Sequence, residues 1–155
     1  MKTIKLKQPY YIFLSIILFS CYTGCLLISP YSETAYQQAT SLKAEAVALM
    51  NKATESYNMH KAEIEEFQTK LEQAYEYAKG RPENELSTRQ WEILKDPDRH
   101  LLGGFISRWK NEDKLGKTFI DNAKEGLIMQ AFDQIIGLES GKIKKKSANI
   151  VGGGQ

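Results

Sequence analysis

Apolar residues recur at steps of three and four along most of this chain, the spacing that places them on one face of an α-helix. The longest such stretch runs from Glu33 to Lys79 and contains neither Gly nor Pro. It therefore predicts one unbroken helix over these residues. The register of the apolar stripe slips by one position near Ser56, which favours packing within a bundle over a long supercoil.

Glycine and proline divide the rest of the chain into shorter helices. Gly80 and Pro82 end the long stretch, because Gly favours a helix C-terminus and Pro cannot continue a helix. Three more helices are expected, the first capped near Ser87 and the others over about 98–110 and 113–139. No stretch alternates with a period of two, so no strand is predicted. The predicted fold class is all-α, with a long helix and an antiparallel fold-back of two to three shorter helices.

Two adjacent glycines, Gly103 and Gly104, lie inside the second of these shorter helices. Each costs about 1 kcal/mol of helix stability relative to Ala. We therefore expect either close approach of a neighbouring backbone or a kink at this point. The helical domain is expected over 33–141, followed by a flexible basic tail over 142–155.

The first thirty residues have a different pattern. Three lysines in residues 1–9 precede an uncharged, mostly apolar run from Tyr10 to Ile28. This arrangement is typical of the n-region and h-region of an export signal. The flanking lysines predict that the N-terminus stays in the cytoplasm while the following body crosses the membrane.

The run Leu18-Phe19-Ser20-Cys21 resembles a lipobox, the processing motif of bacterial lipoproteins. The resemblance implies a signal peptide over 1–20, a lipidated Cys21, and a tether over 21–32. Tyr22-Thr23-Gly24-Cys25 is a second candidate, so Cys25 is the alternative lipidation site. Cys21 is favoured because Leu18 occupies the position where the class prefers Leu. The implied localisation is the bacterial cell envelope, with the inner and outer membranes both open.

Two alternatives to lipidation remain. The apolar run is close to the ~20 residues that span a bilayer, so it fits an uncleaved single-pass anchor. It also fits an ordinary cleaved signal with a soluble product. All three interpretations place the body outside the cytoplasm.

Charge excludes some partners. The formal net charge is +2, with 21 basic and 19 acidic side chains. Residues 1–9 and the tail from Lys142 contain lysines and no acidic residue, so the body between them is net acidic. Nucleic-acid binding requires a basic face on the folded part, and no nucleic-acid partner is expected.

The helical body contains few residues in patterns that could bind a metal or catalyse a reaction. His60 and Glu63 form one Glu/His pair at i, i+3, whereas metal sites in helix bundles need two or more such units. We therefore expect no metal and no cofactor, and His60 is interpreted as a polar position in a helix seam. Neither histidine lies in a recognisable nucleophile motif, so no enzyme is predicted.

Four aromatic residues cluster in the middle of the sequence: Trp91, Phe105, Trp109 and Phe119. At helical spacing such residues are typical of a core. If a pocket exists, they are the candidate ligand or partner contacts, at the junction of the short helices.

The sequence thus predicts a non-enzymatic, lipid-anchored envelope protein with a structural or interaction role and an envelope protein as partner. The alternative is a small-ligand or sensor module at the aromatic junction, and a further one is a single-pass membrane protein with the same body. Self-association stays open.

Lipidation is tested by mass spectrometry of the membrane fraction. The mature N-terminus should be Cys21, or otherwise Cys25, carrying two or three acyl chains, because one chain holds a protein at a membrane only marginally. A Cys21→Ser, Cys25→Ser double variant should remain unprocessed. An intact Met1 in the membrane would contradict lipidation and support the single-pass anchor.

Overall fold

The computed structural model describes residues 29–143. The predicted signal peptide, both cysteines and nearly all of the basic tail lie outside these residues. Within them all regular structure is helical, so the all-α fold class is confirmed. The α-helices are α2 (Glu33–Asn51), α3 (Lys61–Lys79), α4 (Glu85–Lys95), α5 (Leu102–Glu112), α6 (Lys117–Ala123) and α7 (Met129–Glu139).

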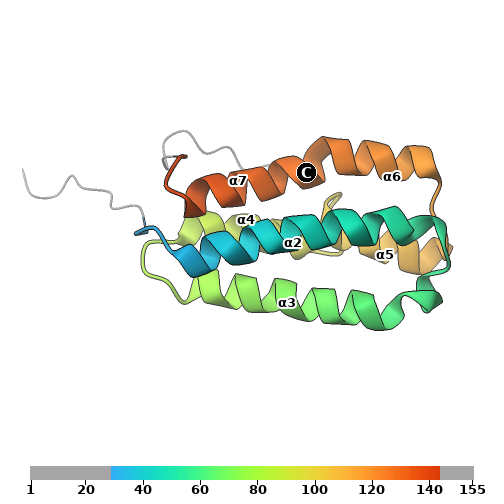
Figure 1. Cartoon of the computed structure of the whole chain (residues 1–155), viewed down its shortest axis with the longest axis horizontal. Helices are drawn as coiled ribbons and strands as arrows, with labels where there is room; N and C mark the ends of the chain where they lie inside the picture. The colour runs from blue at the N-terminus through green and yellow to red at the C-terminus, as the bar shows by residue number, and fades with distance from the viewer. Residues whose placement is uncertain (1–28, 144–155) are drawn as a thin grey trace, which may run out of the picture.

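The helices form four antiparallel arms (Figure 1). The first two arms are α2 and α3, the third is α4 followed by α5, and the fourth is α6 followed by α7. α2 contacts α3 and α7, and α4 contacts the same two helices, which closes a ring around one core. The stripe predicted from sequence faces this core: the side chains of Leu42, Leu49, Ile64, Phe67 and Leu71 are all buried. Small buried residues such as Ala39 and Ala46 let α2 lie close to its neighbours.

The prediction of one helix from Glu33 to Lys79 is wrong, because the chain reverses after Asn51. Two short 3₁₀ turns, Lys52–Thr54 and Tyr57–Met59, separate α2 from α3. Polar side chains around them compete with helical hydrogen bonding, and Ser56 Oγ donates to Asp113 Oδ1 at 2.7 Å. The register slip near Ser56 marks the place of the break.

Backbone hydrogen bonds from a distant loop hold this reversal. The N–H of Tyr57 donates to the carbonyl of Asp113 at 2.8 Å, and the N–H of Leu115 donates to the carbonyl of Ala53 at 2.7 Å. The loop that joins α5 to α6 therefore supplies partners that a continuous helix would have supplied itself. The name "reversal contact" is used below for these two bonds.

The shorter helices also differ in detail from their predicted ranges. The helix expected from residue 98 begins at Leu102, and the helix expected from residue 113 begins at Lys117. The last arm is interrupted by a π-helical turn over Lys124–Ile128, where Gly126 has a non-helical ψ of −130°. α4 begins two residues before Ser87, which is buried rather than capping the helix.

The glycine pair marks a close backbone approach, one of the two outcomes that the sequence predicts. A Cβ on Gly103 would lie 2.2 Å from the carbonyl oxygen of Lys95, and one on Gly104 would lie 1.8 Å from that of Arg99. No side chain fits at either position, since backbone atoms cannot move aside cheaply. The first turn of α5 is thereby seated on the loop that follows α4.

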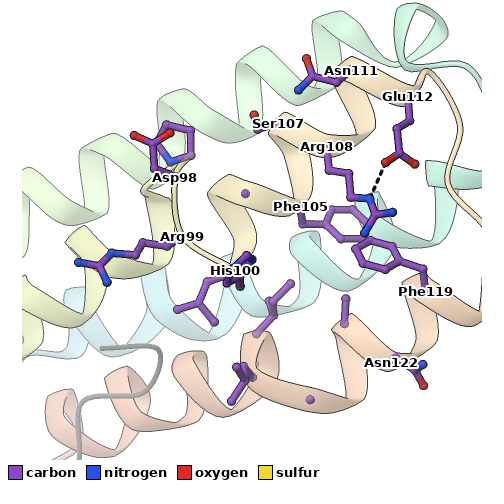
Figure 2. Close-up of a pocket in the computed structure, with 17 residues that line it drawn as sticks. Asp98, Arg99, His100, Phe105, Ser107, Arg108, Asn111, Glu112, Phe119 and Asn122 are labelled. Atoms are coloured by element: carbon purple, nitrogen blue, oxygen red, sulfur yellow. Dashed lines mark hydrogen bonds and ion pairs between the residues drawn. The ribbon is translucent and has the colours of Figure 1, made fainter. Parts of the chain in front are cut away.

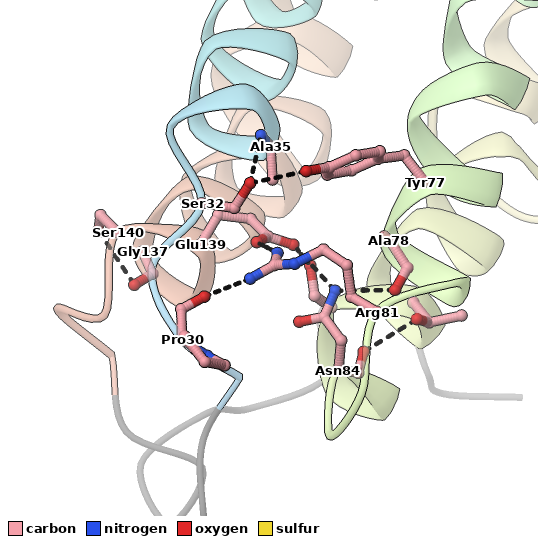
Figure 3. Close-up of polar contacts among 12 residues, drawn as sticks. Pro30, Ser32, Ala35, Tyr77, Ala78, Arg81, Asn84, Gly137, Glu139 and Ser140 are labelled. Carbon is pink, nitrogen blue, oxygen red and sulfur yellow. Dashed lines mark hydrogen bonds and ion pairs between the residues drawn. The ribbon is translucent and has the colours of Figure 1, made fainter.

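A buried ion pair closes the end of the bundle opposite the turn between α2 and α3 (Figure 3). Glu139, at the end of α7, is 2% exposed and pairs with Arg81 from the α3–α4 loop. Asn84 Nδ2 donates to Glu139 Oε1 at 3.2 Å, and the Ser87 hydroxyl donates to the same oxygen. Arg81 also donates to the carbonyl of Pro30. This group, called the end lock below, ties the segment before α2 to the α3–α4 loop and to the end of α7.

Gly103→Ala tests the backbone approach. The added methyl group would force the seated turn apart, so we expect the free energy of unfolding to fall by about 2 kcal/mol or more. Gly80→Ala is the matched control, because its Cβ would meet the carbonyl oxygens of Glu76 at 3.4 Å and Tyr77 at 3.8 Å, which are ordinary van der Waals distances. Urea denaturation measures both. Equal stabilities for the two variants would contradict the packing described here.

Candidate binding groove

An open groove of about 620 Å³ lies between α5 and the arm formed by α6 and the π-helical turn (Figure 2). Its size falls within the range of pockets that hold small ligands. Its polar rim includes Arg99, His100, Arg108, Asn111 and Asn122. Its apolar lining includes Leu101, Phe105, Phe119, Ala123, Leu127 and Ile128. The concavity combines an apolar floor with a polar border.

The groove exists because the third and fourth arms diverge. α4 packs directly against α7, whereas an open groove lies between α5 and α6, which touch through the Phe105 and Phe119 rings. The π-helical turn interrupts the fourth arm beside the opening, and a Cβ on Gly126 would meet no atom within 4 Å. Leu127 next to it is 47% exposed and lines the groove. A break in helix geometry therefore produces an exposed apolar edge.

Two stacked rings and a cation form one wall. The Phe105 and Phe119 rings lie 5.9 Å apart with an interplanar angle of 8°. The Arg108 guanidinium lies 4.1 Å from the centre of the Phe119 ring, and its Nε donates to Glu112 Oε1 at 2.7 Å. These contacts fix the rings in place and put a charged pair at the rim.

The structure separates the four aromatic residues that the sequence grouped. Phe105 and Phe119 line the groove, whereas Trp91 and Trp109 are core residues with 2% and 0% exposure. Trp91 packs edge-on against Phe132 at 6.1 Å. Only the two phenylalanines can contact a groove ligand directly.

Trp109 has a structural role at the reversal. Its indole N–H donates to the carbonyls of Glu55 at 3.0 Å and Asp113 at 3.1 Å. Its ring meets Tyr57 edge-on at 5.8 Å. Burial, and then the negative charge of Glu65, raises the pKa of the Tyr57 hydroxyl. Trp109 thus links the turn before α3 to the end of α5.

His60 lies at the start of α3 rather than in a helix seam. Its Nε2 is 2.7 Å from Glu55 Oε2, and its Nδ1 is 3.6 Å from Glu63 Oε2. A hydrogen bond from Lys52 lowers the pKa of Glu63, and the charges of Lys52 and His60 lower it further. Across residues 29–143, no three His, Cys, Asp or Glu side chains are grouped so that they could hold a metal ion.

Sequence reasoning missed Gly126, Leu127 and Arg108 as groove residues. Leu127 falls within the continuous helix predicted over about 113–139, where nothing in the sequence distinguishes it from a core residue, and Arg108 carries no signal. The available signal was Gly126, the one glycine between Lys117 and Ile136.

No protein family, curated protein or solved structure matches this chain. In the part of the chain that the structure describes, no helix is both long enough and apolar enough to cross a membrane.

Proposed function

We propose that this chain is a non-enzymatic, lipid-anchored protein of the bacterial cell envelope whose helical body binds an envelope protein. The lipobox-like run ending at Cys21 supports the anchor, and the lysines before it support the orientation. An uncleaved apolar span would place the same body on the same side of the membrane. The mass spectrometry described above distinguishes the two attachments.

The end lock is the observation that carries this proposal. Arg81 holds the carbonyl of Pro30, nine residues after Cys21, against the bundle. Because Arg81 also pairs with the buried Glu139, the tether meets a fixed point at one end of the body. The turn between α2 and α3 lies at the other end (Figure 1). An anchor attached there would present the long arms and the far end to partners.

The outward face of α3 suits such a partner. α3 buries its apolar stripe, and Glu65 and Glu72, seven residues apart on one face, have exposed side chains. Glu65 Oε1 is 3.8 Å from Lys61 Nζ, and Glu72 Oε2 is 2.7 Å from Lys95 Nζ. Charges of this kind set the on-rate and specificity of association more than they set fold stability.

A Glu65→Lys, Glu72→Lys double variant tests the interaction. Exposed ion pairs contribute about 0–1 kcal/mol, so the melting temperature should change little. Envelope proteins that co-purify with the wild-type chain from detergent-solubilised membranes should be lost, as measured by quantitative mass spectrometry. Leu127→Asp, on a different surface, is the matched control and should retain them. Retention of every partner by the charge-reversed variant would contradict the proposed face.

The groove favours a second candidate, the binding of a small apolar or amphipathic ligand. A bound ligand would raise the melting temperature by mass action. Leu127→Asp should abolish this shift, whereas the Glu65→Lys, Glu72→Lys variant should keep it. The two variants therefore separate the two candidate functions.

A further inference from the structure

Exposed tyrosines lie at the end of the bundle that contains the end lock, which is called the lock end below. Tyr31, just before α2, is 60% exposed, and Tyr77, in the last turn of α3, is 38% exposed. The hydroxyls of Tyr77 and Ser32 are 3.0 Å apart (Figure 3). The Tyr31 ring lies 6.4 Å from the ring of Tyr36, in the first turn of α2. At the far end of the bundle, by contrast, Tyr57 is buried.

The lock end is also where the chain enters the bundle from the apolar run. Ile28 closes that run and is bonded to Ser29, and the carbonyl of Pro30 accepts a hydrogen bond from Arg81. Arg81 pairs with the buried Glu139, so the start of the body is fixed to the bundle. When the apolar run or a lipid attaches the chain to a membrane, the lock end is therefore the part of the body that lies closest to it.

Chain length keeps the lock end near the bilayer in either attachment. An uncleaved span that ends at Ile28 leaves two residues before Tyr31. Cys21 and Ser29 are eight residues apart, at most about 28 Å of extended chain. The turn between α2 and α3 lies about 28 Å further away, the length of the 19 residues of α2. A lipid tether allows contact with the bilayer without enforcing it, so the surface chemistry of the lock end decides.

That chemistry suits the headgroup region of a bilayer. Tyrosine is enriched there because its ring is apolar and its hydroxyl is polar, and Tyr31 and Tyr77 both expose such rings. The exposed charged residues of the lock end have both signs and include Lys79, Lys142, Glu33 and Glu83. Charge therefore gives this surface no strong attraction to anionic lipid, and the tyrosine rings carry the contact.

We propose that the lock end is a membrane-binding surface, with the rings of Tyr31 and Tyr77 at the level of the lipid headgroups. The arms of the bundle then extend away from the bilayer, and the far end lies furthest from it. The inference rests on the membrane attachment in the proposed function. It adds a direct contact between the folded body and the lipid, which neither a lipidated cysteine nor an apolar span supplies.

Tryptophan quenching by brominated lipid tests this contact. The full-length Tyr77→Trp variant is reconstituted into vesicles of phosphatidylethanolamine and phosphatidylglycerol, with and without bromine on the acyl chains. Tyr77 is far in sequence from the apolar run, so the anchor alone does not bring it to the bilayer. Met59→Trp is the matched control, because Met59 is 73% exposed at the far end. Trp91 and Trp109 are buried and contribute equally to both variants.

Bromine should reduce the emission of the Tyr77→Trp variant at least about twice as much as that of the control, because only the lock end meets the lipid. Adding Tyr31→Ser should lower this excess quenching without changing the melting temperature, since Tyr31 lies outside the core. Excess quenching that Tyr31→Ser leaves unchanged would contradict the role of the rings.

Flotation of the same vesicles separates this inference from the proposed attachment. A chain that floats with the vesicles but shows equal quenching in the Tyr77→Trp and Met59→Trp variants would overturn the membrane-binding surface alone. A chain that does not float would overturn the attachment and the surface together.

Discussion

The bundle depends on the reversal contact between the turn at Ala53–Tyr57 and the loop at Asp113–Leu115. Two backbone hydrogen bonds of 2.7 and 2.8 Å join segments that lie about sixty residues apart in sequence. The indole N–H of Trp109 adds two more bonds at the same place. Local polar side chains weaken the helix at this point, and these partners replace the helical hydrogen bonds that the break gives up. With them, one long amphipathic stretch becomes two arms, and the core can close.

The two ends of the body are held by different chemistry. At the end of the bundle where α2 begins, the buried carboxylate of Glu139 pairs with Arg81 and accepts hydrogen bonds from Asn84 and Ser87. Removing one member of such a buried pair typically costs about 3–5 kcal/mol, because the other charge stays buried. At the far end the contacts are backbone hydrogen bonds around a buried indole. Between the two ends, the π-helical turn at Gly126 lets the third and fourth arms separate and opens the groove.

Much of the fold was predictable from the spacing of apolar residues. Leu42, Leu49, Ile64 and Phe67 are buried as their positions indicate, and Gly103 marks the close approach that its helix cost suggested. The break after Asn51 was not predictable from local propensity, because its hydrogen-bonding partners come from residues 109–115. The sequence offered only the register slip near Ser56 as a local sign. Tertiary contacts overrode helix propensity there.

The candidate site was predictable only in part. Phe105, Trp109 and Phe119 all occur at helical spacing. Nothing in the sequence around them distinguishes a ring that faces the core from one that faces a groove. The deciding feature is the geometry of another arm, where Gly126 interrupts the helix and exposes Leu127. Periodicity assigns residues to a helix face, but the divergence of two arms determines which face is covered.

Amide hydrogen exchange in the full-length chain tests the reversal contact most directly. The N–H groups of Tyr57 and Leu115 donate in the two bonds of the reversal contact and in no helical hydrogen bond. If the reversal contact holds the bundle together, both amides should exchange only on opening of the core, with protection of at least about a thousandfold. Exchange of either amide at the rate of an unprotected loop would contradict the account.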